Sequence, residues 1–393
     1  MNFDIIIVGG GMVGASLALS LRASPYRIAL VDANATNLAD DKRFIALNHS
    51  SYCLFENLKI WDSLAPHATA INEVHVSHRG SFGITRLTAR EMNLAALGFV
   101  VPAKEINLAL YNNLENITLL RPARLIDMSQ TSEEAELTIE TPEGTQKIRG
   151  KIIIGADGNY STVRQLLNIS EKKLDYQQSA IVSMIALNRS HHHIAYERFQ
   201  DNGAIAMLPL TENRAAMIWT ADNEEIHLLE KMSDDVFLQT LQKKFGYRLG
   251  RLKKNHGRAL FPLVSIQAEQ QIKGRTILIG NALHALHPIA AQGLNLALYE
   301  VSTLSDYLKK NSLDTFSLDN FAEAQQKIIT RFSHHLNTLF TSDFFVLNAA
   351  RQLGMIGLDL CRPLKLRFMR QLLGQTGRAI PIRERNNHET ISA

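Results

Sequence analysis

Residues 3–18 read FDIIIVGGGMVGASLA, and this stretch decides the fold. Its first six residues form a largely apolar run, which is typical of a short strand buried on both faces of a parallel sheet. Glycines follow, and residues 12–24 have the apolar spacing of a helix. A second apolar run, RIALVDA, occupies residues 27–33. The sequence therefore predicts a β-α-β unit at the start of the chain.

Between the predicted strand and helix lies the pattern Gly9-x-Gly11-x-x-Gly14. Gly9 permits a tight turn, Gly11 lets the backbone approach a pyrophosphate, and Gly14 lets helix and strand pack closely. The phosphates would lie at the positive N-terminal end of the helix. Asp32, at the end of the second strand, is placed to accept hydrogen bonds from ribose hydroxyls. This combination predicts a dinucleotide-binding site rather than the glycine-rich turn of an ordinary α/β domain.

The composition is that of a soluble globular protein. Of the 393 residues, 46% are hydrophobic and 20% are charged, and the length suffices for two or three compact units. A net charge of +4, without a Lys/Arg run interleaved with aromatic residues, argues against nucleic-acid binding. Cys53 and Cys361 are the only cysteines, so neither a disulfide framework nor a cysteine metal site is expected.

The segment 277–300, ILIGNALHALHPIAAQGLNLALYE, has no charged residue before its last position. Its length would suit a membrane span. Gly280, Asn281 and Pro288 interrupt it, however, and further polar side chains in its middle argue against a span. No basic region precedes the first apolar run, so we expect no signal peptide and a cytoplasmic location.

Patterns typical of buried strands recur in three separated parts of the chain, within residues 3–33, 151–158 and 275–282. Alternating apolar and polar residues with turn glycines favour antiparallel sheet within residues 71–140 and 175–265. We therefore expect a parallel sheet assembled from three pieces, with a second sheet inserted between them and a helical end of the chain.

Two later stretches, GADGNYSTVR (155–164) and IGNALHALHPIAAQGLNLAL (279–298), indicate which dinucleotide binds. Together with the N-terminal glycine pattern, they give the chain three motifs in a fixed order. The FAD-dependent aromatic hydroxylases, which are the single-component flavoprotein monooxygenases, carry GxGxxG, GADGxxSxVR and GDAAHxxxPxxGQGxN in this order. The chain resembles this family over about residues 1–340.

Within that family the chain is most similar to the ubiquinone-biosynthesis branch. Residues 41–64 resemble the branch's segment after the second strand, and residues 74–101 resemble the start of the substrate domain in its 2-octaprenyl-6-methoxyphenol hydroxylases. The stretch 197–210, ERFQDNGAIAMLPL, is similar to the branch's RFxxxGPLAxLPL, with Ala204 in place of proline. Asn281 stands where the wider family has Asp, but Asn is familiar in this branch, and its amide oxygen accepts hydrogen bonds without a charge.

The resemblance implies an α/β fold. It has a Rossmann-like FAD-binding domain with a parallel sheet from three separated segments, an inserted mixed or antiparallel β-sheet substrate domain, and a helical C-terminus. The expected bounds are 1–70, 98–174 and 268–340 for the FAD-binding domain, 71–97 and 175–267 for the substrate domain, and 341–393 for the helical, basic C-terminal region.

The same resemblance implies FAD as cofactor and NAD(P)H as co-substrate. Reduced flavin would react with O2, and the resulting C4a-hydroperoxide would hydroxylate a polyprenyl phenol, while the protein orients the ring and excludes water. The helix after Pro288 would point its N-terminus at the flavin ring, with Gly293 allowing close approach. No catalytic side chain is assigned. The residues expected to bind FAD are Gly9, Gly11, Met12, Val13, Gly14, Asp32, Arg43, Leu125, Asp157, Gly158, Asn281, Pro288, Gly293, Leu294 and Asn295.

The histidines do not indicate a metal site. His284 and His287 could share a helix face, but no carboxylate or cysteine cluster accompanies them, and the resemblance places them in a loop. The HHH run at 191–193 lies in a polar connector and is expected to be solvated. We therefore expect no metal.

The C-terminal segment 351–385 carries eight Lys and Arg residues but only two acids, interleaved with Leu, Ile, Met and Phe. Such a segment can lie on an anionic membrane surface, from which a polyprenyl phenol would be taken. One interpretation is therefore peripheral contact with the inner face of the cytoplasmic membrane. The other is a helical pair that packs on its own domain with a basic outer face. Other quinone-biosynthesis proteins are further candidate partners.

Two other functions stay open on the sequence. A flavin-dependent reductase of isoprenoid chains would have the same fold and would consume no O2. A non-catalytic flavoprotein would scaffold a biosynthetic complex. A separate NAD(P)H domain is not expected, because no second GxGxxG follows a strand.

Overall fold

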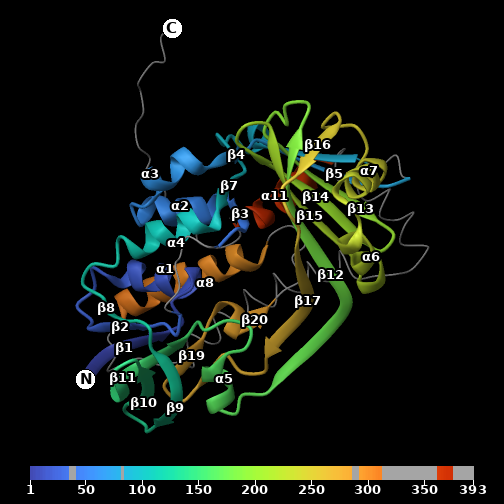
Figure 1. Ribbon diagram of the computed structural model, residues 1–393. Helices are drawn as coiled ribbons and strands as arrows, with labels where there is room; N and C mark the ends of the chain where they lie inside the picture. Colours follow the sequence, from blue (N-terminus) through green and yellow to red (C-terminus); the bar gives the residue numbers. More distant parts are fainter. Residues whose placement is uncertain (35–40, 81–83, 286–291, 312–360, 375–393) are drawn as a thin grey trace.

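The computed structural model describes residues 1–34, 41–80, 84–285, 292–311 and 361–374. Figure 1 shows two sheets in separate halves of the molecule, joined by the two long strands β12 (Glu171–Leu187) and β17 (Ala259–Ala268). The half that contains the N-terminus, called the first half below, carries a stack of helices on one side of its sheet.

The first sheet is built from the strands β1 (Asn2–Val8), β2 (Ile28–Val31), β8 (Thr118–Leu120), β9 (Arg124–Gln130), β10 (Ala135–Thr141), β11 (Gly144–Gly155), β18 (Ile272–Lys273) and β19 (Thr276–Leu278). Their order is β18-β19-β11-β1-β2-β8, with the β9–β10 hairpin attached to β11. β19, β11, β1, β2 and β8 run parallel. They come from three separated parts of the chain, which confirms the α/β fold expected from the sequence.

One face of the first sheet is covered by the helices α1 (Met12–Leu21), α2 (His49–Asn57), α3 (Trp61–Leu64), α4 (Ala103–Tyr111) and α8 (Gln292–Lys310). Ile5 and Ile7 of β1 are fully buried in this layer. Ile6 and Ile153 belong to the opposite face, in the core with the β9–β10 hairpin and α5 (Thr162–Leu166). Burial on both faces explains why these strands read as apolar runs without alternation.

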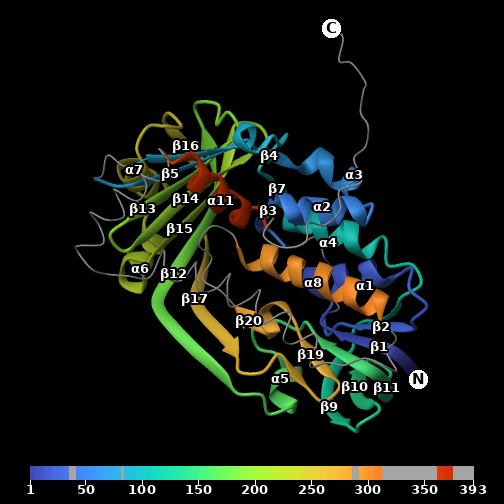
Figure 2. The same ribbon diagram turned by 180° about the vertical axis from the view of Figure 1, so that it is seen from behind.

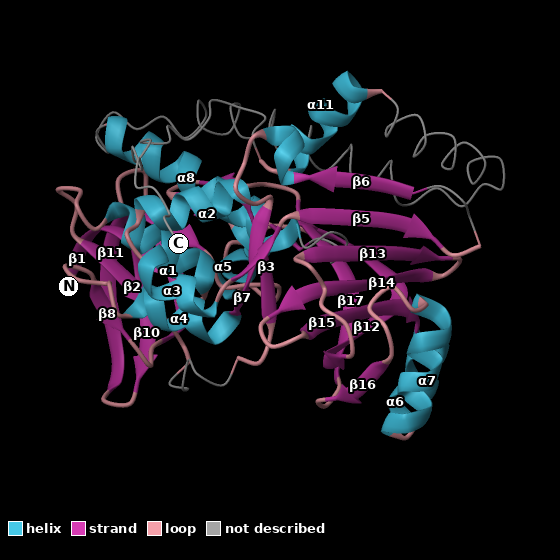
Figure 3. Cartoon of the chain, turned by 90° about the horizontal axis from the view of Figure 1, so that it is seen from above, coloured by secondary structure: helices cyan, strands magenta, loops and turns pink. Residues whose placement is uncertain are grey.

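The second sheet contains β12 and β17 together with β5 (Glu73–His78), β6 (Ile84–Thr88), β13 (Ile194–Gln200), β14 (Gly203–Leu210), β15 (Arg214–Asp222), β16 (Leu252–Asn255) and β20 (His284–Ala285). Its order is β20-β17-β12-β15-β14-β13-β5-β6, and β16 pairs with β12. β13 and β5 pair in parallel, so the sheet is mixed. Figures 2 and 3 show α6 (Asn223–Lys231) and α7 (Asp234–Phe245) at its outer side, where Trp219, Phe237 and Phe245 are buried between helices and sheet.

A small third sheet, β3 (Phe44–Asn48), β7 (Gly98–Pro102) and β4 (Thr69–Ile71), lies between the two halves. Ile71 and Val100 share an apolar cluster with Ala195 and Ala216 of the second sheet. The face of the second sheet that is turned away from α6 and α7 therefore looks toward the first half. Short helical turns complete the fold: η2 (Ala65–His67), η3 (Ala89–Met92) and η4 (Gly280–Ala282).

Part of the sequence interpretation of residues 71–140 is wrong. Residues 103–111 form α4, and residues 118–120 form a parallel strand of the first sheet. Short apolar runs do not distinguish a strand from a buried helix, and pairing partners are not visible in the pattern. The domain boundaries stay predictions, and β12 and β17 run across those expected at residues 174 and 267.

Of the predicted helical C-terminal region, the structure describes α11 (Arg362–Leu372) and the residues next to it. The rest of that region lies outside the described residues, and so do residues 312–340 of the predicted FAD-binding domain. Met369 and Leu373 are buried in a cluster with Leu87. Lys365 forms an ion pair of 2.8 Å with Glu91. In the described part of the chain, no helix is both long and apolar enough to cross a membrane.

Candidate cofactor site

Four parallel strands end in one row at the same edge of the first sheet. Val8 pairs with Val31 and with Gly155, and Gly155 pairs with Leu278. Open α/β sheets bind ligands outside the carboxyl ends of their strands. The turns that leave these ends bring together the predicted cofactor residues Gly9, Gly11, Asp32, Asp157, Gly158 and Asn281.

The glycines at this edge divide into two kinds. A Cβ atom at Gly9, where φ is +109°, would lie 2.4 Å from the carbonyl oxygen of Ala156, and one at Gly14 would lie 1.9 Å from that of Gly9. These two positions need glycine for the fold itself. A Cβ atom at Gly11 or Gly158 would meet no atom of the described residues within 4 Å. Gly11 precedes α1, and its open backbone fits the pyrophosphate of a dinucleotide.

Asp32 is buried and already held in position. The Tyr111 hydroxyl lies 2.9 Å from Asp32 Oδ2 and 2.7 Å from the Gly10 carbonyl oxygen. Arg121 Nε lies 3.4 Å from the same carboxylate. Burial, together with the charge of Asp32, raises the pKa of Tyr111, which keeps the phenol protonated beside the carboxylate. Tyr111 and Arg121 could not be identified from the sequence, because neither belongs to a recognisable motif.

Arg164 joins the second motif to the third. Its guanidinium is buried, and it donates to the carbonyl oxygens of Ala282 (2.7 Å) and Asn159 (2.6 Å). It also pairs with Glu171 at 2.6 Å. Because each carbonyl belongs to a turn that leaves the sheet edge, Arg164 fixes the two turns relative to each other.

Asp157 presents an unused acceptor at the same edge. Its Oδ2 accepts a hydrogen bond from the Val163 N–H at 3.1 Å. Its Oδ1 is buried and has no hydrogen-bond partner in the described structure. Burial raises the pKa of Asp157. A ligand hydroxyl would satisfy this oxygen, which supports the prediction that Asp157 contacts the cofactor.

The uncharged run ends at Glu300, whose carboxylate contacts the beginning of the same run. Glu300 Oε2 accepts a hydrogen bond of 2.9 Å from the Gly280 N–H, and Glu300 Oε1 lies 2.5 Å from His284 Nε2. Asn281, between the two partners, is exposed. His287 lies outside the described residues, and the described part of the chain holds no group of three potential metal ligands. His284 therefore serves as a partner of Glu300.

Two predicted cofactor residues use their side chains for packing. Asn295 donates from Nδ2 to the Ala46 carbonyl oxygen at 2.8 Å, and its Oδ1 accepts from the Asn48 N–H at 2.8 Å and the Ser51 hydroxyl at 2.7 Å. This amide ties α8 to β3 and α2. The side chain of Leu125 is buried in the core beneath the first sheet. A contact of Leu125 with FAD would therefore use the backbone.

The remaining predicted residues of the first and third motifs lie near the same edge. Met12 begins α1 and is buried, and Val13 lies beside Gly280, where an added Cβ would be 3.2 Å from Val13 Cγ1. Leu294 is half-buried and packs on the core of the first sheet. A Cβ atom at Gly293 would meet no atom of the described residues within 4 Å, so these residues leave room for a ligand at the start of α8.

Arg43 pairs with a residue that is not one of the predicted cofactor contacts. The guanidinium of Arg43 is exposed and pairs with Asp41 at 2.7 Å, and this hydrogen bond raises the pKa of Arg43. Pro288 lies outside the described residues. The contacts of both with FAD stay predictions.

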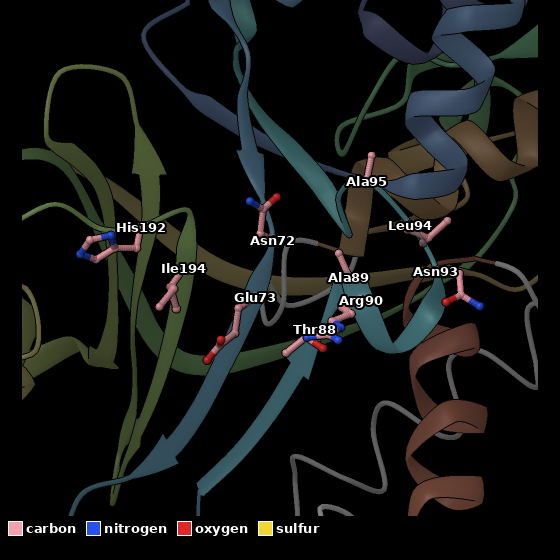
Figure 4. A pocket seen from close by; sticks show the side chains of 10 residues that line it. All are labelled: Asn72, Glu73, Thr88, Ala89, Arg90, Asn93, Leu94, Ala95, His192 and Ile194. Carbon is pink, nitrogen blue, oxygen red and sulfur yellow. The ribbon is translucent and has the colours of Figure 1, made fainter. Parts of the chain in front are cut away.

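A surface hollow of about 660 Å³ lies elsewhere, around the start of β5, the end of β6 and η3. Figure 4 shows Asn72, Glu73, Thr88 and Arg90 in it, with His192 and Ile194 across from them. None of its lining residues belongs to the three motifs. The hollow therefore does not mark the cofactor site.

The FAD binding domain family matches residues 2–312. The chain belongs to this family. FAD is therefore its cofactor, which confirms the cofactor implied by the sequence resemblance.

Similar proteins extend over almost the whole chain. The chain is 28% identical to ubiquinone hydroxylase UbiL of Rhodospirillum rubrum (94% of this chain, 89% of the relative). It is 29% identical to 3-demethoxyubiquinol 3-hydroxylase of Escherichia coli (94% and 93%). Among solved structures, p-nitrophenol 4-monooxygenase PnpA of Pseudomonas putida superposes with a TM-score of 0.76 at 15% identity (95% and 98%). That structural likeness shows a shared fold.

Proposed function

We propose that the protein is an FAD-dependent monooxygenase that uses NAD(P)H and O2 to hydroxylate the aromatic ring of a polyprenyl phenol in ubiquinone biosynthesis. The single observation that carries the proposal is the convergence of three family motifs on one sheet edge, with open backbone at Gly11 and Gly158. The relatives with ubiquinone-hydroxylase names support the choice of pathway.

The chain's own residues hold the cofactor and shape the site. Gly11 and the start of α1 would hold the pyrophosphate, Asp32 the ribose, and Asp157 Oδ1 a further hydroxyl. The N-terminal turn of α8, with Gly293, would stabilise negative charge on the flavin ring by roughly 0.3–1 kcal/mol. Bound FAD, reduced by NAD(P)H, supplies the O2 chemistry that the side chains lack.

An apolar surface supports an aromatic substrate. On the face of the second sheet that looks toward the first half, Val182 and Met184 of β12, Ala206 and Leu208 of β14, and Ile218 of β15 are half-exposed. A ring bound against them would be oriented by shape and shielded from water.

The C-terminal helix supports a membrane contact on its outer face. Met369 and Leu373 pack on the chain, as the packing interpretation expects, while Arg362, Arg367 and Arg370 are exposed. We propose peripheral binding to anionic lipid through these arginines. Sedimentation of the protein with vesicles containing anionic lipid tests this, because replacing all three arginines with Gln should abolish binding. Unchanged binding would reject the surface.

Turnover separates the proposal from its alternatives. Purified protein with a 2-polyprenylphenol should consume NAD(P)H and O2 and yield a product heavier by one oxygen atom. A reductase of isoprenoid chains would consume no O2, and a scaffold protein would give no turnover. A gene knockout whose accumulated precursor is identified by mass would then name the hydroxylation that is missing.

A further inference from the structure

Glu197 lies on β13 and faces the first half of the molecule. Its neighbour Tyr196 packs against Phe245 of α7, and its other neighbour Arg198 donates to the Lys244 carbonyl oxygen of the same helix. Ala195 belongs to the apolar cluster that contains Val100 of β7. Because successive strand residues point to opposite faces, Glu197 shares the face of Ala195 and points away from α7.

On this face Glu197 stands in a row of apolar residues. It pairs with Val76 of β5 and with Ala206 of β14, and Ala206 pairs in turn with Ile218 of β15. The row continues through Val182 of β12. These four apolar neighbours are half-buried, as Glu197 is. The carboxyl is therefore set in the apolar wall proposed for the substrate.

Among the described residues, no cation compensates the carboxyl of Glu197. Within the described part of the chain, no side chain forms an ion pair or hydrogen bond with Glu197, and burial raises its pKa from the usual 4.5 to about 7. In the described part of the chain, a titratable side chain nearby on the same face is His78 of β5, whose Nδ1 lies 2.8 Å from the Arg79 carbonyl oxygen.

The elements beside this row add no free charge in the described structure. β6, β14, β15 and β17 contribute Thr85, Ala206, Ile218 and Ala259. The charged residues Glu91 of η3 and Lys365 of α11 pair with each other. A carboxyl without a partner on an apolar wall is costly for folding alone and suits a group that binds a ligand's polar atom.

We infer that Glu197 is the residue that accepts the hydrogen bond, and then the proton, of the substrate's phenol hydroxyl. The inference rests on the proposed function and assigns the base that the sequence left unassigned. The O–H bond of the phenol breaks, the proton binds a carboxylate oxygen of Glu197, and the electron pair stays on the phenol oxygen. Nothing is oxidised or reduced in this step. The ring carbons ortho and para to the oxygen become more electron-rich, as attack by an electrophilic oxygen requires.

Ligand binding tests the inference without turnover. The probe is 2-geranylphenol, titrated calorimetrically into the oxidised, FAD-loaded protein without NAD(P)H. Its affinity should rise about tenfold between about pH 5 and pH 9, because the ionised carboxylate accepts the hydroxyl's hydrogen bond more strongly. In Glu197→Gln the affinity should be independent of pH. The methyl ether of the probe, which has no O–H to donate, should bind wild-type protein without this pH dependence.

Two control variants locate the titrating group. Glu212→Gln removes a glutamate that is 77% exposed in the turn between β14 and β15, and His78→Gln removes the nearby histidine. Both should keep the pH dependence. The inference is overturned if Glu197→Gln keeps it, if His78→Gln loses it, or if the methyl ether shows it. Failure of wild-type protein to bind the phenol at any pH would instead reject the proposed substrate class, and the inference with it.

Discussion

His284 Nε2 lies 2.5 Å from Glu300 Oε1, and both side chains are buried. Burial opposes a charged imidazole, but the charge and hydrogen bond of Glu300 outweigh it and raise the pKa of His284. The other carboxylate oxygen holds the Gly280 N–H. One glutamate thus fixes both ends of the turn that begins the third motif.

Glu300→Gln should destabilise the protein by about 3–5 kcal/mol near pH 6, the usual cost of breaking a buried pair. A histidine with a raised folded-state pKa contributes stability that is fully present below its unfolded pKa of about 6.5 and is lost as pH rises through the folded value. The loss should therefore shrink in alkaline solution. Urea unfolding at acidic and alkaline pH measures it, with the exposed Glu140→Gln as the control. An equal loss at both pH values would contradict a charged pair.

Gly11→Ala and Gly14→Ala should separate binding from folding. The described residues leave room for a Cβ atom at Gly11, so Gly11→Ala should fold with a stability within about 1 kcal/mol of wild type. It should bind FAD about tenfold or more weakly, a loss of about 1.4 kcal/mol in binding free energy. Gly14→Ala places a methyl group 1.9 Å from the Gly9 oxygen and should cost about 1–3 kcal/mol in the apoprotein. Apoprotein unfolding and FAD fluorescence titration measure the two effects. Equal FAD affinity in Gly11→Ala and wild type would reject the pyrophosphate placement.

Gly293→Asp should lose bound FAD while the fold survives. The position is open, and an acid in the first turn stabilises a helix by roughly 0.3–1 kcal/mol. The same carboxylate would repel the negative charge of reduced flavin and obstruct its ring. The flavin absorbance that copurifies with the protein is the measurement, and Gly293→Ala is the uncharged control. A normal flavin spectrum in the Asp variant would place the ring elsewhere.

Glu197→Gln should stabilise the protein in a pH-dependent way. The folded-state pKa of Glu197 is about 7 and its ordinary value is 4.5, so the unfolded chain binds fewer protons between these values. Wild-type stability therefore falls as pH rises through this window, and the Gln variant avoids the loss. Its advantage should grow to at most about 3 kcal/mol above neutral pH, because a tenfold difference in proton affinity is worth about 1.4 kcal/mol. Thermal unfolding of the wild-type and Glu197→Gln apoproteins across this pH window measures the difference in stability. A difference that stays constant with pH would contradict the raised pKa of Glu197.

Much of the cofactor site could be predicted because its residues sit in short, ordered motifs. Gly9 and Gly14 have the roles that their spacing indicated, since both depend on backbone within a few residues. Tyr111 and Arg121 could not be predicted, because they reach Asp32 only through the packing of α4 and the pairing of β8 with β2. Asn295 shows the reverse case, since its motif predicts a cofactor contact but its side chain holds β3.

The sequence by itself determined the β-α-β start, the glycine turns and the family, because these depend on periodicity and local backbone geometry. It also located the uncharged run that ends at Glu300. Only the tertiary structure decided that Glu300 returns beneath Gly280 and that Glu197 faces the apolar wall. Strand register and helix packing set those relationships between residues far apart in the chain, and a one-residue slip in register would turn Glu197 to the other face.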